Sequence, residues 1–183
     1  MAQIETVDKL FIHELNDLRS AEEQLAKALP LMAASATAVE LRQGFEMHLE
    51  QTRVQLRRVE EALKLLDERP NGDICEGMKG LIEEAQKVMK SVEKGAVLDS
   101  ALLDAGRKVE HYEITSYRSA VSKAHELGHE VVAGLLEVNL QEEELADYRL
   151  QQIAQGMMPF SGPGPDPRDD GSEVLVGTGQ TTQ

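Results

Sequence analysis

The chain has few of the residues from which several kinds of site are built. It contains a single cysteine, Cys75, so an intramolecular disulfide is excluded, and neither a cysteine-based zinc site nor an iron–sulfur cluster can be built from one chain. It contains no tryptophan, three tyrosines and three phenylalanines, so aliphatic residues and alanine must fill the core. That choice of residues favours helices over sheets.

Basic residues are scarce relative to acidic ones. The 183 residues include 19 Lys and Arg against 33 Asp and Glu, which gives a formal net charge of −14. Such a charge repels phosphate backbones and anionic lipid surfaces, so we expect no nucleic-acid binding and no membrane attachment. It attracts cations, although an acidic surface also serves solubility alone.

Long apolar runs are absent as well. No stretch approaches the roughly 18 uninterrupted apolar residues of a membrane span, and residues 1–9 lack the basic start and apolar run of a secretory signal. Together with the single cysteine, this predicts a cytoplasmic protein.

Apolar residues recur at the three-and-four spacing of a helical face in four long segments, which predicts an all-α protein. The expected long helices span residues 6–34, 37–66, 98–127 and 129–155. A weaker pattern at 73–96 predicts a short helix inside a long connection. The other two joints are short, so each should link an antiparallel pair, and the long connection should cross the length of a four-helix bundle.

Local signals indicate where these helices bend, begin and end. Pro30 should kink or loosen the first helix, because proline removes a backbone donor and clashes with the preceding turn. A capping box beginning at Thr37 predicts the start of the second helix. Asp99 or Ser100 is expected to cap the helix at 98–127, and Gly128 to end it.

The composition changes near residue 157 to Gly, Pro, Asp, Ser and Thr. We therefore expect the helical bundle to occupy residues 1–156 and a disordered tail to occupy residues 157–183.

Polar residues interrupt the apolar faces of the first two long helices. Glu22 falls on the face that runs through Leu18 and Leu25, so its carboxylate should point inward and needs a cation or a donor. His48 follows Phe45 on the inward face of the second helix, and a neutral imidazole is a good ligand for iron, manganese or zinc. Taken alone, a buried histidine is more often a hydrogen-bonded structural residue.

Acids also fall on the inward faces of the last two long helices. Glu110 and Glu113 lie one turn apart and share a face. Glu143 and Asp147 fall on the apolar face of the helix at 129–155. All four long helices thus bring a potential ligand to the interior near the middle of their length.

Two readings explain this arrangement. Two divalent cations, bridged by carboxylates with an imidazole alongside, would satisfy the acids, and helix bundles build di-iron and di-manganese sites in this way. The alternative is a buried polar network in which the donors are Thr52, Arg107, Tyr112 and Tyr117.

The chain resembles the YciE/YciF ferritin-like family over roughly residues 6–155. The likeness is carried by Asn16-Asp17 with Ala21-Glu22, His48 with Thr52, Glu110-His111-Tyr112-Glu113-Ile114 before Tyr117, and Leu136 to Glu142-Glu143. The resemblance implies a rubrerythrin-like, ferritin-like antiparallel four-helix bundle with a di-metal site, often dimeric and associated with stress responses. It also implies that Glu22, Glu110, Glu113 and Glu143 are metal ligands.

The chain departs from the ferritin and rubrerythrin ligand pattern at two positions. Those proteins place Glu-x-x-His on the second helix, but Phe45 stands three residues before His48 and Gln51 three residues after it. Three residues after Glu143 stands Ala146 in place of a second histidine, and Asp147 is its imperfect substitute. A site with fewer nitrogen ligands favours manganese more than the usual site does.

The function expected from the sequence is that of a carboxylate protein with two divalent metal ions, iron in preference to manganese. Its ligand set is Glu22, His48, Glu110, Glu113, Glu143 and Asp147. Small oxidants such as peroxide or oxygen are the expected reactants, in a peroxidase-like or ferroxidase-like reaction, and a homodimer is the expected assembly. The alternative is a non-catalytic helical scaffold or partner-binding protein with a structural polar core.

Overall fold

The computed structural model describes residues 4–157, which form five helices and no strand. The helices are α1 (Val7–Ser35), α2 (Val39–Leu65), α3 (Glu76–Ser91), α4 (Ala96–Glu126) and α5 (Glu130–Met157). The predicted all-α class is confirmed, and every expected helix is present. Apart from residue 157, the predicted C-terminal tail lies outside the described residues.

Helix α1 begins as its local sequence requires. The Thr6 side chain accepts a hydrogen bond from the backbone amide of Lys9, at 3.2 Å, and so satisfies one of the free donors of the first turn. The helix continues through Pro30 to Ser35.

The start of α2 is stabilised from a distance, and the predicted capping box is wrong. The N-cap residue is Ala38, which has no side-chain capping bond. The carboxylate of Asp99 instead accepts from the backbone amides of Thr37, at 2.7 Å, and Ala38, at 2.9 Å, and from the Thr37 hydroxyl. The prediction that Asp99 or Ser100 caps α4 is also wrong, because α4 begins earlier, after Gly95.

The turn between α4 and α5 is a glycine stop, as predicted. Gly128 has φ +77°, a left-handed conformation that costs a glycine little. The amide of His129 then reaches the carbonyl of Ala124, at 2.8 Å, which closes the last turn of α4.

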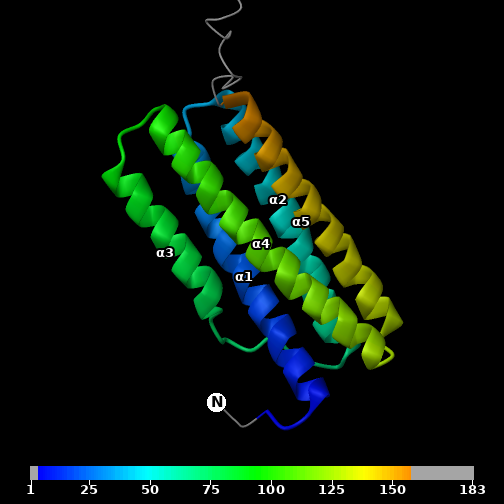
Figure 1. The fold of residues 1–183 in the computed structure, drawn as a ribbon. Helices are drawn as coiled ribbons and strands as arrows, with labels where there is room; N and C mark the ends of the chain where they lie inside the picture. Colours follow the sequence, from blue (N-terminus) through cyan, green and yellow to red (C-terminus); the bar gives the residue numbers. More distant parts are fainter. Residues whose placement is uncertain (1–3, 158–183) are drawn as a thin grey trace, which may run out of the picture.

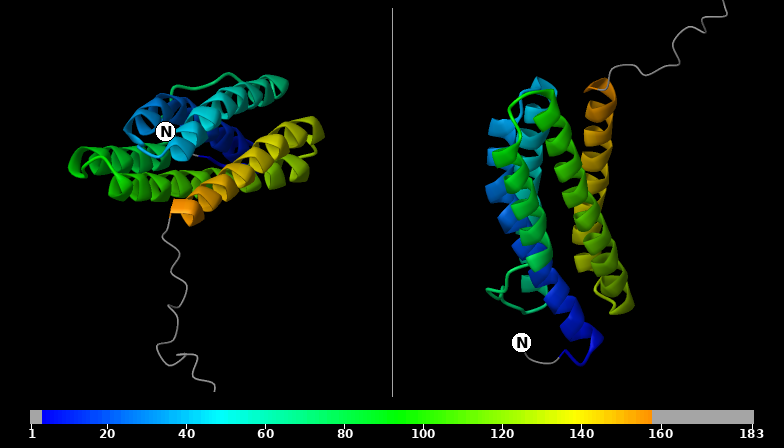
Figure 2. Two further views of the ribbon diagram at one scale, coloured as in Figure 1. Left: turned by 90° about the horizontal axis from the view of Figure 1, so that it is seen from above. Right: turned by 60° about the vertical axis from the view of Figure 1, so that its left-hand side comes forward.

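The four long helices lie side by side, and α3 covers one side of them (Figure 1). Helices α1 and α2 form one antiparallel pair, and α4 and α5 form the other (Figure 1). Helix α3 packs against α1 and α4. It belongs to the connection from α2 to α4 and carries the chain back along the length of the molecule (Figure 2). Within residues 4–157, no helix combines the length and apolar character needed to cross a membrane.

The core consists of two apolar clusters. They lie on either side of the middle of the long helices. The first cluster is built mainly from the C-terminal half of α1, the N-terminal halves of α2 and α4, and α3, and includes Leu25, Phe45 and Val109. The second is built from the opposite ends of α1, α2 and α4 together with the N-terminal part of α5, and includes Leu18, Val59 and Tyr117. Each long helix thus has a gap in its apolar face between the two clusters.

Candidate metal centre

The gap between the two apolar clusters is filled with buried polar side chains. In α1, Glu22 lies between Leu18 and Leu25, which belong to different clusters. The other helices repeat this arrangement, with His48, Thr52 and Gln55 from α2, Glu110 and Glu113 from α4, and Glu143 from α5. The helical periodicity places these side chains in one interior layer.

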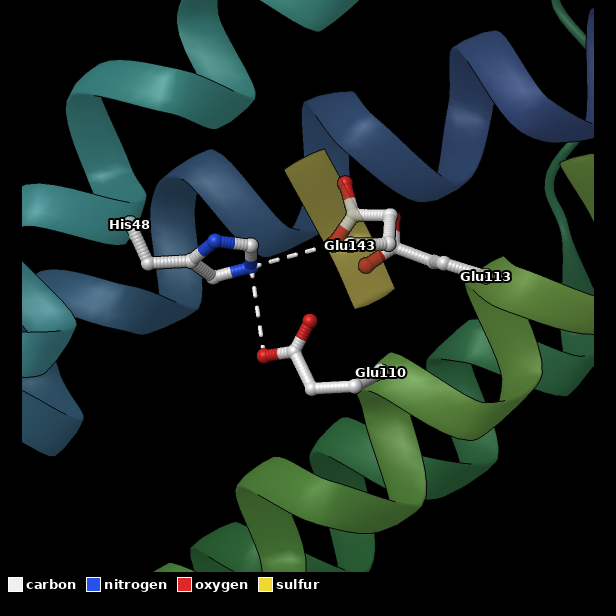
Figure 3. A group of neighbouring side chains, drawn as sticks. All are labelled: His48, Glu110, Glu113 and Glu143. Carbon is white, nitrogen blue, oxygen red and sulfur yellow. Dashed lines mark ion pairs between the residues drawn. The ribbon is translucent and has the colours of Figure 1, made fainter. Parts of the chain in front are cut away.

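Four of these residues form a tight group. One ligand atom each from His48, Glu110, Glu113 and Glu143 lies within 4.8 Å of all the others. Figure 3 shows their side chains converging from α2, α4 and α5. A separation of this size lets one metal ion contact all four.

The imidazole of His48 is neutral in this environment. Burial, and then the nearby Arg149 guanidinium, lowers the pKa of His48 to about 4. Its Nε2 lies 3.3 Å from Glu110 Oε1 and 3.7 Å from Glu143 Oε2 (Figure 3). A neutral histidine with its ring nitrogen aimed at two carboxylates is in the form that binds metal.

The glutamates repel each other in a region with little water. Burial, followed by the charge of Glu143, raises the pKa values of Glu22, Glu110 and Glu113 well above their usual range. Burial likewise raises the pKa of Glu143 to about 7. Without a cation, these groups therefore hold protons near neutral pH that ordinary glutamates would release.

The polar atoms of this layer have few partners inside the protein. Some buried side-chain nitrogens and oxygens of the described residues have no hydrogen bond. All of them except Glu14 Oε2 belong to this layer. They lie in Glu22, His48, Thr52, Gln55, Glu110, Glu113 and Glu143. Native proteins rarely leave such groups unpaired. The donor set of carboxylates and one imidazole fits hard or borderline divalent cations, so these residues fit the metal that the sequence predicts.

The Glu22 carboxylate accepts a hydrogen bond from a tyrosine of another helix. The Tyr117 hydroxyl donates to Glu22 Oε1, and Asn139 Nδ2 donates to that hydroxyl oxygen at 3.0 Å. Asn139 Oδ1 in turn accepts from Arg58 Nη1 at 2.9 Å. This chain of donors connects α1, α4, α5 and α2 and fixes one edge of the layer.

Comparison with known proteins agrees with this architecture. The family described as a domain of unknown function, DUF892, matches residues 6–159. This chain belongs to the DUF892 family. The Escherichia coli protein YciF is 41% identical over 155 residues, which are 82% of this chain and 92% of YciF. The predicted likeness to the YciE/YciF family is confirmed.

Two solved structures show the family fold. The crystal structure of the E. coli stress protein YciF matches with a TM-score of 0.82 and 39% identity, over 84% of this chain and 98% of that one. YcfI from Rhodopseudomonas palustris, described as a proposed structural protein, matches with a TM-score of 0.79 and 39% identity over the same shares.

Five of the six predicted ligands lie in the buried layer of this DUF892 protein, and Asp147 lies apart from it. The Asp147 carboxylate accepts from Arg107 Nε at 2.8 Å and lies 3.4 Å from Nε2 of the exposed His111. Glu22 is in the layer but outside the tight group of four. Arg107, one of the donors of the alternative polar network, therefore serves Asp147 and not the buried acids.

Two buried polar residues in or beside the layer were not predicted from the sequence. Gln55 is fully buried, and neither atom of its amide has a hydrogen bond. It lies two turns after His48 on the same face of α2, a spacing that could have revealed it. Asn139 is also fully buried and holds Tyr117. It lies three residues after Leu136 and four before Glu143 on the inward face of α5, so the same periodicity could have revealed it.

Proposed function

We propose that this DUF892 protein is a ferritin-like four-helix bundle that binds two divalent metal ions, iron in preference to manganese, and reacts with peroxide or oxygen. One observation carries the proposal, namely the layer of buried glutamates and a neutral histidine whose oxygens and nitrogens lack partners in the protein. Several ionised carboxylates cannot stay unpaired in a core, and bound cations would pair them.

The proposed site has two unequal halves. The tight group of His48, Glu110, Glu113 and Glu143 would hold one ion with mixed nitrogen and oxygen ligands. Glu22 lies outside that group but close enough for the charge of Glu143 to raise its pKa. A second ion would take Glu22 and share carboxylates with the first, so its ligands would be oxygens.

Two bound ferrous ions would supply the two electrons that, with two protons, reduce one hydrogen peroxide to two waters. The protein supplies the setting for this reaction. The two apolar clusters exclude bulk water from either side of the layer. The Tyr117 hydroxyl donates to Glu22 and so orients that carboxylate, while Asn139 prevents Tyr117 from turning away.

A role in stress protection is consistent with the E. coli relative, which is described as a stress protein. A cytoplasmic location and a homodimer are part of the same proposal. Gel filtration tests the assembly, because a dimer would exclude a hollow storage cage of many subunits.

The alternative, a non-catalytic scaffold, requires that protein donors neutralise the buried acids. The description of the R. palustris neighbour as a structural protein would agree with that alternative. However, within residues 4–157 only Glu22 accepts a hydrogen bond from a donor of the kind expected, Tyr117. The remaining glutamates of the layer favour the metal site.

Metal content is the first test of the proposed function. We expect about two iron or manganese ions per chain in protein purified without chelators, and none in the Glu110→Ala/Glu113→Ala variant, because that variant removes two ligands of the tight group. Plasma mass spectrometry measures both. A matched control is Glu46→Ala/Glu50→Ala, which removes two exposed acids of α2 and should leave the metal content unchanged. Wild-type protein purified without metal would contradict the proposal.

Replacing Gln55 separates a metal site from a structural network. We expect Gln55→Leu to leave the metal-free protein as stable as before or more stable, because it removes a buried amide without partners, while metal affinity falls about tenfold. Thermal unfolding with chelator and a metal-binding titration give the two readings. Gln43→Leu, which changes an exposed glutamine of the same helix, is the control. Lower stability of the metal-free Gln55→Leu protein would favour the structural network.

A further inference from the structure

Solvent reaches the proposed metal centre from one side. Glu22, Glu113 and Glu143 are 0% exposed, whereas His48 is 5% exposed and Glu110 is 2% exposed. The accessible surface of the layer therefore belongs to the two residues at its His48 edge. Any molecule that reaches the layer without unfolding the protein must arrive there.

A narrow crevice between α2 and α5 ends at these two residues. His48 and Glu110 line its inner end, and Ala146 of α5 forms part of its wall. The volume that it offers a water-sized molecule is about 20 Å³. Since one water needs roughly 10–15 Å³ on this measure, the crevice accepts a ligand of one or two non-hydrogen atoms and no larger group.

The mouth of the crevice is made of three larger side chains. Arg149 Nη1 donates to Gln51 Oε1 at 3.3 Å, a bond that crosses from α5 to α2. Met47 stands beside them and is 44% exposed. A guanidinium at this place leaves the entry of small neutral molecules unaffected.

The wall of the crevice depends on small side chains. Ala146 lies three residues after Glu143, on the same side of α5, and is almost fully buried. A larger side chain here would occupy the space beside His48 and Glu110. The crevice therefore exists because position 146 is an alanine.

We propose that this crevice is the entrance and binding position for an oxidant with two non-hydrogen atoms, hydrogen peroxide or dioxygen. Ala146 and the Arg149–Gln51 pair set the largest size of molecule that the crevice admits. This inference rests on the proposed function. It adds that bulky organic peroxides are excluded, although they have the same reactive bond.

The test compares two peroxides on ferrous-loaded protein by stopped-flow absorbance. We expect wild-type protein to favour hydrogen peroxide over tert-butyl hydroperoxide by at least about a hundredfold more than free ferrous ion does. Arg149→Ala and Met47→Ala should open the mouth and reduce that preference at least about tenfold. Arg53→Ala removes an exposed arginine of α2 that pairs with Glu50, so it should leave the preference unchanged.

A second measurement uses binding without turnover. Ala146→Leu fills the wall, so we expect nitric oxide, a two-atom ligand, to bind the ferrous-loaded variant at least about tenfold more weakly than wild type, at equal metal content. If that affinity is unchanged, or if wild-type protein shows the same peroxide preference as free iron, the crevice is not the entrance, while the metal site stands. If wild-type protein holds no metal, the proposed function fails and this inference fails with it.

Discussion

Without bound metal, the protein should lose about 1–4 kcal/mol of stability between pH 6 and pH 8, which is a fall in Tm of about 3–12 °C. The cause is the raised pKa of Glu143, about 7, and of Glu22, Glu110 and Glu113. In the unfolded chain, these groups are already ionised above about pH 5. The folded protein thus holds more protons than the unfolded chain in this range, and its stability falls as pH rises.

Each proton that only the folded state holds contributes about 1.4 kcal/mol per pH unit. His48 acts in the opposite direction, because its pKa is lowered to about 4 and the unfolded histidine still binds a proton up to about pH 6.5. Above that pH both forms of His48 are neutral, so the glutamates alone set the slope. Bound metal should reverse the slope, because metal competes with protons for the same atoms.

Thermal unfolding followed by circular dichroism, at intervals from pH 5.5 to 8.5 with and without chelator, measures this effect. Glu143→Gln removes one of the titrating groups and should make the slope of the metal-free protein shallower. A metal-free protein whose Tm stays constant or rises across pH 6.5–8.5 would contradict the raised carboxyl pKa values.

Asp99→Ala should destabilise the protein by about 3 kcal/mol and lower Tm by about 6–12 °C. The Asp99 carboxylate accepts from the backbone amides of Thr37 and Ala38 and from the Thr37 hydroxyl, and it is 2% exposed. Removing it takes away the charged acceptor of these donors at the start of α2, and a hydrogen bond to a charged group contributes about 1.5–3 kcal/mol.

Chemical denaturation of the variants measures the loss. Asp99→Asn keeps one acceptor and should have an intermediate effect. Asp104→Ala, an exposed position of the same helix, should change stability by less than about 0.5 kcal/mol. Metal content should stay the same in Asp99→Ala, because Asp99 is far from the buried layer along α4. Equal stability of wild type and Asp99→Ala would show that water or another group satisfies the two amides.

The polar layer is tolerated in the core because apolar clusters lie on both sides of it. The two apolar clusters hold the long helices together above and below the layer, so the fold survives a polar centre that by itself is unfavourable. The residues that stabilise the fold and those of the proposed metal centre thus occupy different parts of each long helix. A protein built in this way tolerates changes of ligand better than changes in the clusters.

The inward direction of the predicted ligands could be read from the sequence because an α-helix turns by about 100° per residue. This geometry is local, so the apolar residues around Glu22, His48, Glu110, Glu113 and Glu143 were enough to place all five in the interior. The periodicity of α5 does not decide the role of position 147. Asp147 lies about 40° around α5 from Glu143, close to the edge of the inward face. Whether that edge meets the metal centre or Arg107 depends on how α4 approaches α5.

Four features were decided by the tertiary structure. Asp99, at a position that the local sequence assigns to its own helix, serves the start of α2, because the fold brings segments 62 residues apart together. Asn139 and Gln55 owe their roles to helices that are distant in sequence. The crevice beside Ala146 needs both α2 and α5.

The sequence by itself determined the helices, their order and the inward direction of five predicted ligands, because each of these depends on neighbours within a few residues. The tertiary structure alone decided the distances between those residues, the pairing of Asp147 with Arg107 and the single open side of the layer. These depend on the packing of two helical pairs against each other, and the periodicity of one helix does not contain that information.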